Sequence, residues 1–373
     1  MSKSFDVCIR GDGIVGRTLA LLLAKERLRV ALVARPPGTV ASEPNSDVRA
    51  YALNSASRQL LEKLRAWPDA TAVTAVSAMH VWGDSGGHLD FAPATSHAPD
   101  EALAWIVDVP ALEETLAQAL RFQPQVEVIG DASEAKAALT VVCEGQKSAS
   151  RQEFGAHWTM KPYAQRAVAA RLVSDRLHGG RARQWFADGD ILALLPFGGT
   201  GGNSLALVWS VSVERAGLLE KMAPEAFVDE LSRVCGEHAG KLSLTSKVAS
   251  WPLALSTADH WVGPGWALAG DAAHTVHPLA GQGLNLGLAD AQAMADVLAH
   301  REYWRPLGDE RLLRRYERSR KADVAAMGAV TDGLHGLFAQ SDPRWQALRN
   351  WGMKAVARSS PLKAWLRRQA TGL

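Results

Sequence analysis

The sequence has few cysteines and no long apolar run. Its three cysteines, Cys8, Cys143 and Cys235, lie far apart and form no CxxC pair, so neither a zinc site nor a disulfide framework is indicated. A reducing cytoplasm is the expected compartment. The absence of 18 consecutive apolar residues argues against a spanning helix. The polar start, residues 1–6, predicts no signal peptide.

The chain also lacks a strong charge of either sign. A formal net charge of +2 argues against nucleic acid as the main partner. A hydrophobic content of 47% with 21% charged residues is typical of a globular protein. The length of 373 residues predicts two domains. Tryptophan is plentiful, with 13 residues, and we expect some of them to line an aromatic pocket.

The first motif is a glycine-rich turn between an expected strand and an expected helix. Gly11, Gly13 and Gly16 follow apolar residues 7–9 and open a helix expected over residues 14–26. Glycines let the backbone approach a pyrophosphate, and the helix N-terminus supplies free N–H groups. A tight turn without a ligand gives the same pattern, so the motif is weak when it stands alone.

A second glycine-rich motif lies far downstream and strengthens the first. Asp271 follows an expected strand, residues 267–269, through Gly270. Residues 278–285 then read Pro-Leu-Ala-Gly-Gln-Gly-Leu-Asn. Paired with this distant motif, the first glycine turn becomes a strong indication of a dinucleotide site.

Together these motifs resemble the flavin-dependent aromatic monooxygenases and, within them, the ubiquinone-biosynthesis hydroxylases. The likeness runs through nearly the whole chain and includes residues 47–54, 163–173, 185–196, 315–321 and 370–372. It implies an α/β fold, in which a discontinuous FAD-binding Rossmann-like domain carries an inserted antiparallel β-sheet substrate domain and C-terminal helices.

This division predicts a definite order of segments. We expect the FAD-binding domain at 1–70, 99–160 and 256–335, the substrate domain at 71–98 and 161–255, and a C-terminal helical segment at 336–373. Hydrophobic periodicity predicts helices near 54–66, 108–120 and 224–238. Strands are expected at 30–33, 126–129 and 139–142 in one sheet, and at 167–173, 183–187, 191–195 and 205–211 in the other.

The resemblance implies FAD as cofactor and assigns residues to it. Its pyrophosphate would bind at Gly11, Gly13 and Gly16, and Asp271 would contact the ribityl and pyrophosphate region. Arg49 matches an arginine that contacts flavin, and Arg35 would also lie near the cofactor; a solvated surface arginine is the alternative for each. The flavin ring would lie against Pro278 and the helix start formed by Gly281, Gln282, Gly283, Leu284 and Asn285, where the helix dipole favours the anionic reduced ring.

Two positions depart from the family pattern. The second strand of a dinucleotide fold normally ends in an acidic residue that binds the adenosine ribose, and here that position is Ala34. Glu43 or Asp47 are possible substitutes. In the middle motif, residues 143–151, Glu144 replaces the usual aspartate and places the carboxylate one methylene further out.

The candidate catalytic residues are His277, which could hydrogen-bond a phenol, and Pro278 on the flavin side. We expect no catalytic triad, because reduced flavin itself activates O2 as a C(4a)-hydroperoxide in this family. His274 and His277 have metal-like spacing but no local third ligand, so no metal site is predicted there and His274 is interpreted as structural. Candidate substrate-lining residues are Trp185, Leu194, Pro196, Phe197 and Trp209.

The implied reaction is hydroxylation of the aromatic ring of a polyprenyl-phenol intermediate in ubiquinone biosynthesis. O2 is the co-substrate and NAD(P)H the implied electron donor, although no second Rossmann motif is present. The alternatives are a same-fold flavoenzyme with another aromatic substrate and a cofactor-depleted scaffold subunit of a quinone-biosynthesis complex. Residues 344–368 carry seven cations and no acid, which suggests attachment to a membrane surface or to such a complex; a helix docked on the body is the alternative.

Overall fold

The computed structural model describes residues 3–34, 47–83, 87–91, 102–187, 189–276 and 282–338. Its first layer is a six-stranded sheet with the order β16-β17-β9-β1-β2-β8. Five of these strands are parallel, and β16 pairs antiparallel with β17. The strands are β1 (Lys3–Arg10), β2 (Val30–Val33), β8 (Val126–Ile129), β9 (Ala135–Val142), β16 (Val262–Gly263) and β17 (Trp266–Leu268).

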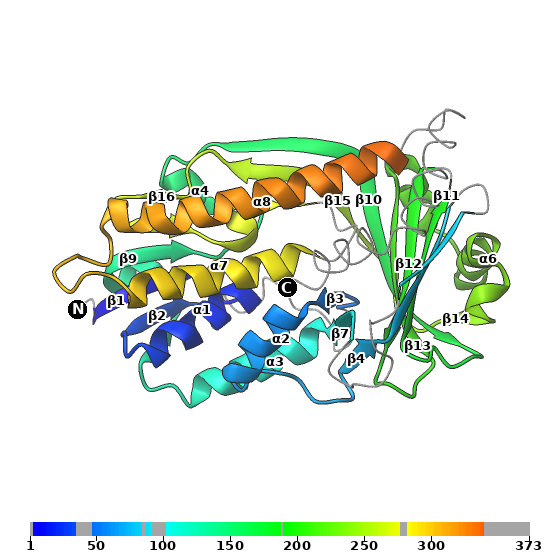
Figure 1. Ribbon diagram of the computed structural model, residues 1–373, viewed down its shortest axis with the longest axis horizontal. Helices are drawn as coiled ribbons and strands as arrows, with labels where there is room; N and C mark the ends of the chain where they lie inside the picture. The colour runs from blue at the N-terminus through cyan, green and yellow to red at the C-terminus, as the bar shows by residue number, and fades with distance from the viewer. Residues whose placement is uncertain are drawn as a thin grey trace.

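Helices cover this sheet and bury their apolar sides against it (Figure 1). The apolar helix that the sequence predicted after the first glycine motif is α1 (Ile14–Lys25). It packs against α3 (Val109–Arg121) and α7 (Gln282–Ala299), and α7 in turn packs against α8 (Glu310–Phe338). The shorter helices are α2 (Ser55–Lys63) and α4 (Ala149–Glu153). None of the helices in the described ranges is long and apolar enough to cross a bilayer.

A second sheet has the order β18-β15-β10-β13-β12-β11-β5-β6, with β14 also on β10. It was expected to be antiparallel throughout, but β5 pairs with β11 in parallel. That strand enters from an earlier part of the chain, so no hairpin fixes its direction. The strands are β5 (Ala78–Trp82), β6 (His88–Phe91), β10 (Trp158–Ser174), β11 (Arg181–Ala187), β12 (Asp190–Phe197), β13 (Ser204–Ser212), β14 (Leu242–Leu244), β15 (Ala249–Ala258) and β18 (His274–Thr275).

The two faces of this large sheet have different neighbours. On one face lie α5 (Val213–Leu219) and α6 (Pro224–Cys235), followed by the 3-10 turn η2 (Gly236–Ala239). The six-stranded sheet and its helices lie toward the opposite face (Figure 1). Between them is a small antiparallel sheet of β3 (Ala50–Leu53), β7 (Ala104–Asp108) and β4 (Val73–Val76), which contacts β12. The remaining 3-10 turns are η1 (Ala132–Glu134) and η3 (Gly270–Ala272).

Candidate cofactor and substrate site

The first glycine turn is built for close backbone approach. Gly11 has a φ of +111°, and a Cβ atom there would lie 2.5 Å from the carbonyl oxygen of Cys143. At Gly16 a Cβ atom would lie only 1.9 Å from the carbonyl oxygen of Gly11. Both glycines are therefore required by the packing of the chain on itself.

Gly13 has a different environment. It is the N-cap of α1, with φ −74° and ψ −177°, a backbone conformation open to any residue. As a glycine it provides no side-chain cap, and no acidic residue occupies the first turn of the helix. The first-turn N–H groups and the helix dipole therefore favour an anionic ligand, and this set of donors fits a pyrophosphate.

The second glycine motif meets the first at one side chain. Gly270 follows β17 with a φ of +62°, and a Cβ atom on it would lie 3.2 Å from Cγ2 of Val15. A Cβ atom on Gly287 of α7 would lie 2.8 Å from the same methyl group. The structure therefore packs α1, the Gly270–Asp271 turn and α7 together, as a single cofactor site requires.

Asp271 and Arg49, both predicted to contact the cofactor, lie in one electrostatic environment. The side chain of Asp271 is exposed to solvent, yet burial among protein atoms raises the pKa of its carboxyl, while the charges of His274 and Arg49 act to lower it. Such a carboxylate reaches solvent but is closely surrounded by protein.

Arg49 is held by a neighbouring carboxylate. Its Nε lies 2.9 Å from Oδ1 of Asp47, and Nη2 lies 2.5 Å from Oδ2. Burial raises the pKa of Asp47, but the hydrogen bonds and charge of Arg49 outweigh it and leave that pKa below its usual value. Asp47 is therefore engaged with Arg49, and its suggested role in place of an acidic residue at Ala34 has no support from this contact.

Arg171 is a residue that the sequence analysis missed. From β10 it donates through Nη2 to the carbonyl oxygen of Arg49 at 2.7 Å and to Oδ1 of Asp108 at 2.8 Å. Its guanidinium also lies 3.7 Å from the ring centroid of Phe197. It connects the large sheet to the Arg49 loop. An isolated arginine inside a predicted strand gives no sequence signal of this role.

Side chains of the middle motif, residues 143–151, form hydrogen bonds within the motif and to the Gly270–Asp271 turn. Glu144 accepts hydrogen bonds from the hydroxyls of Ser148 and Ser150, at 2.8 and 2.6 Å. Arg151 is buried and donates to the carbonyl oxygens of Ala272 and Gln146, at 3.1 and 2.9 Å. The longer glutamate thus organises the start of α4, and the arginine supports the turn that carries Asp271.

His274 is structural, as predicted, although its partner is a carboxylate and not the loop carbonyls that were expected. Its Nε2 lies 2.6 Å from Oδ2 of Asp290, a residue of α7 with no exposed surface. The same oxygen accepts the N–H of Gly270 at 2.9 Å, and Oδ1 accepts Nε of Arg320 at 2.7 Å. The sequence analysis did not predict this role of Asp290, because nothing in the sequence around it distinguishes it from a solvent-exposed helix residue.

At the start of α7, Gln282, Gly283 and Leu284 occupy the first turn, as predicted. The side chain of Asn285 is committed to protein contacts: Oδ1 accepts the N–H of Asn54 at 3.0 Å and Nδ2 donates to the carbonyl oxygen of Ala52 at 2.9 Å. It fixes α7 to the N-cap of α2. The predicted site residues Arg35, His277, Pro278 and Gly281 lie outside the described residues.

The five predicted substrate-lining residues do not form one wall. Trp185, Leu194 and Trp209 are buried in the core between the large sheet and helices α5 and α6. Strand alternation puts Pro196 on that face too, while Phe197 lies on the opposite face. Packing alone explains the three core residues, and their position does not support a role at the substrate.

The face shared by Phe197 is lined differently. Leu195, Phe197 and Val208 are partly exposed there. Their cross-strand neighbours on this face are small, with Ala206 opposite Leu195 and Ala169 and Ala193 flanking Val208. Around Leu195 and Val208 the face is therefore apolar with small neighbouring side chains, and the guanidinium of Arg171, opposite Ala206, lies beside this apolar area.

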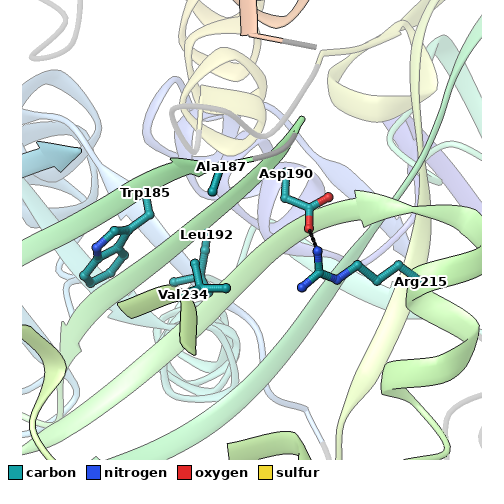
Figure 2. A pocket seen from close by; sticks show the side chains of 6 residues that line it. All are labelled: Trp185, Ala187, Asp190, Leu192, Arg215 and Val234. Atoms are coloured by element: carbon teal, nitrogen blue, oxygen red, sulfur yellow. Dashed lines mark ion pairs between the residues drawn. The ribbon is translucent and has the colours of Figure 1, made fainter. Parts of the chain in front are cut away.

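A small cavity opens instead on the other face (Figure 2). It is lined by Trp185, Ala187, Leu192 and Val234 and by an ion pair of Asp190 with Arg215 at 2.7 Å. Its volume of about 50 Å³ admits a few water molecules but is small for an aromatic ring. We therefore do not assign it to the substrate.

A parallel sheet with glycine turns at two strand ends, joined to a large mainly antiparallel sheet, defines a dinucleotide-binding fold with a second, sheet-rich domain. The model of the FAD binding domain family matches residues 117–331. Ubiquinone hydroxylase UbiL of Rhodospirillum rubrum is 30% identical, over 99% of this chain and 90% of that protein. The 3-demethoxyubiquinol 3-hydroxylase of Escherichia coli is 29% identical, over 99% of this chain and 98% of its own length.

The fold is shared with solved structures. PqsL, a probable FAD-dependent monooxygenase from Pseudomonas aeruginosa, superposes with a TM-score of 0.76 at 21% identity, covering 94% of this chain and all of that one. The chain belongs to the flavin-dependent aromatic monooxygenases, in the family of the ubiquinone hydroxylases. The predicted fold class is confirmed.

Proposed function

We propose that this protein uses FAD, O2 and NAD(P)H to hydroxylate the aromatic ring of a polyprenyl-phenol intermediate in ubiquinone biosynthesis. The observation that carries the proposal is the meeting of both glycine motifs at Val15, beside Asp271 and Arg49. The relatives named as ubiquinone hydroxylases align over nearly the whole chain, which supports the same substrate class here.

The chain's own residues would bind and orient the cofactor. The uncapped start of α1, at Gly13, would hold the pyrophosphate, and the exposed carboxylate of Asp271 would face the ribityl chain. Arg49, fixed by Asp47 and Arg171, would contact the flavin. When bound, FAD supplies the oxygen-activating chemistry.

The substrate ring would lie against the apolar part of the large-sheet face that carries Leu195, Phe197 and Val208, beside Arg171. Small side chains on that face leave room for a ring, and apolar walls exclude water from the reaction. We retain Phe197 as a substrate-lining candidate and add Leu195 and Val208. His277 and Pro278 remain proposals from the sequence.

Purified protein tests the proposal directly. We expect a yellow protein with stoichiometric FAD, whose reduction by NADH or NADPH is measured at the flavin absorbance band. Mass spectrometry should show a polyprenyl-phenol gaining one oxygen atom only when O2 and the reductant are both present. A protein that binds no flavin would instead support the non-catalytic scaffold alternative.

Mass spectrometry of the aromatic lipids in a deletion strain then identifies the natural substrate. We expect an unhydroxylated polyprenyl-phenol to accumulate and to disappear on complementation. An unchanged lipid profile, together with an active flavoprotein, would point to another aromatic substrate.

A further inference from the structure

The hairpin at the edge of the large sheet carries two histidines and an aspartate on one face. His80 of β5 lies opposite Asp90 of β6, and Trp82 lies opposite His88. Because side chains alternate along a strand, these four residues share a face. The other face of the hairpin is apolar and packs on Phe186.

The three potential ligand side chains converge. Their ligand atoms all lie within 4.8 Å of one another. Oδ1 of Asp90 is 2.5 Å from Nδ1 of His80 and 3.0 Å from Nε2 of His88. The ligand atoms of a tetrahedral zinc ion are about 3.3 Å apart, given zinc–ligand bonds of about 2.0–2.2 Å. Metal binding would replace the contacts of Asp90 with the two histidines and bring the three ligand atoms to that separation.

We propose that His80, His88 and Asp90 bind one divalent cation of the zinc type, with water as the fourth ligand. Two imidazoles and a carboxylate suit Zn²⁺, Co²⁺ or Cu²⁺, whereas Mg²⁺ and Ca²⁺ prefer oxygen ligands throughout. Binding requires both imidazoles to be neutral and therefore weakens in acid.

The location indicates a structural role. On the same face Trp82 stacks on Trp185 and on His238, with ring centroids 4.8 and 4.7 Å apart. The cluster thus lies on the side of the sheet that carries α6, away from the proposed cofactor site. The cation would hold β6 against β5 at the edge of the sheet, where strand pairing is most easily lost.

Titration of tag-free, chelator-treated full-length protein with Co²⁺ tests this. We expect one equivalent to bind with the visible absorption of a tetrahedral site, and Zn²⁺ to displace it. Asp90→Asn and His80→Ala should each weaken binding at least about ten-fold. His300→Ala, which removes an exposed histidine at the end of α7 outside the cluster, should bind as the unchanged protein does.

Two further measurements keep the outcome clear. Circular dichroism establishes whether each variant is folded. If His80→Ala is unfolded, the metal affinity of the near-isosteric Asp90→Asn tests the proposal. FAD content should be the same in every variant, because the hairpin lies away from the cofactor. Absence of stoichiometric Co²⁺, or equal affinity in Asp90→Asn and the unchanged protein, would overturn the proposal and leave a hydrogen-bonded His–Asp–His cluster.

Discussion

Gly13 and Gly16 belong to one motif but are glycine for different reasons. A side chain on Gly16 collides with the backbone of Gly11, whereas Gly13 has a conformation that any residue can adopt. We expect Gly16→Ala to lower the free energy of unfolding by about 1–3 kcal/mol, as overpacking does.

Gly13→Val should keep the melting temperature of the flavin-free protein and abolish FAD retention. Stoichiometric FAD in Gly13→Val would refute the pyrophosphate assignment.

Ala34 offers no acceptor for the ribose hydroxyls of the adenosine. It directly follows β2, and its N–H is bonded to the carbonyl oxygen of Ile129 at 3.0 Å. A charged hydrogen bond is worth about 1.5–3 kcal/mol, so Ala34→Glu should tighten FAD by about ten-fold or more. Ala34→Gln is the matched control and should gain less. Unchanged affinity in a calorimetric titration of Ala34→Glu would mean that another residue already binds the ribose.

At the scale of elements, Asp290 joins α7, α8 and the Gly270–Asp271 turn. Burial raises the pKa of its carboxyl, but His274 and Arg320 outweigh burial and hold it below its ordinary value of 3.8. The stabilisation is therefore complete above pH 3.8 and is lost as the pH falls through the lower, folded-state pKa. Asp290→Asn should lower the free energy of unfolding by about 3–5 kcal/mol near neutral pH.

Urea denaturation measures this loss at several pH values. The difference between Asp290→Asn and the wild-type protein should shrink below pH 3.8, because the carboxyl is protonated there in the unfolded chain and becomes protonated in the folded protein only at a lower pH. Asp296→Asn, at an exposed position of the same helix, is the control and should have little effect. A difference that is the same at all pH values would show that ionisation of Asp290 contributes nothing.

Elements were more predictable from the sequence than side-chain roles. The apolar period located α1 and the helix expected near residues 54–66, which is α2 and whose N-cap Asn54 accepts the N–H of Ser57 at 2.8 Å. The sequence could not predict which face of the large sheet each side chain lies on, because both faces are covered and the strands carry apolar residues on both. Trp209 and Phe197 therefore looked equivalent. Roles such as that of Arg171 depend on contacts between distant strands and leave no local pattern.

At the scale of the molecule, Arg171 links the large sheet to the cofactor site. Arg171→Ala should remove the hydrogen bond to the Arg49 carbonyl oxygen and leave Asp108 without its cationic partner. Because such hydrogen bonds contribute about 1.5 kcal/mol, FAD binding should weaken by about ten-fold. Arg166→Ala is the matched control, since that arginine lies on the same strand but donates to Ser250 at 2.8 Å. Equal FAD affinity in both variants would exclude the link.

The basic segment 344–368 lies outside the described residues and follows α8, which ends at Phe338. Its seven cations and absence of acids predict electrostatic attachment to anionic membranes, where the polyprenyl substrate that we propose would reside. Removal of the residues after Asp342 should abolish sedimentation with anionic liposomes and leave the melting temperature unchanged. Binding of the full chain should also fall with salt, because charges more than about 10 Å apart are screened at 0.1 M. A helix merely packed on the body predicts the reverse: a lower melting temperature on truncation and no sedimentation of the intact protein.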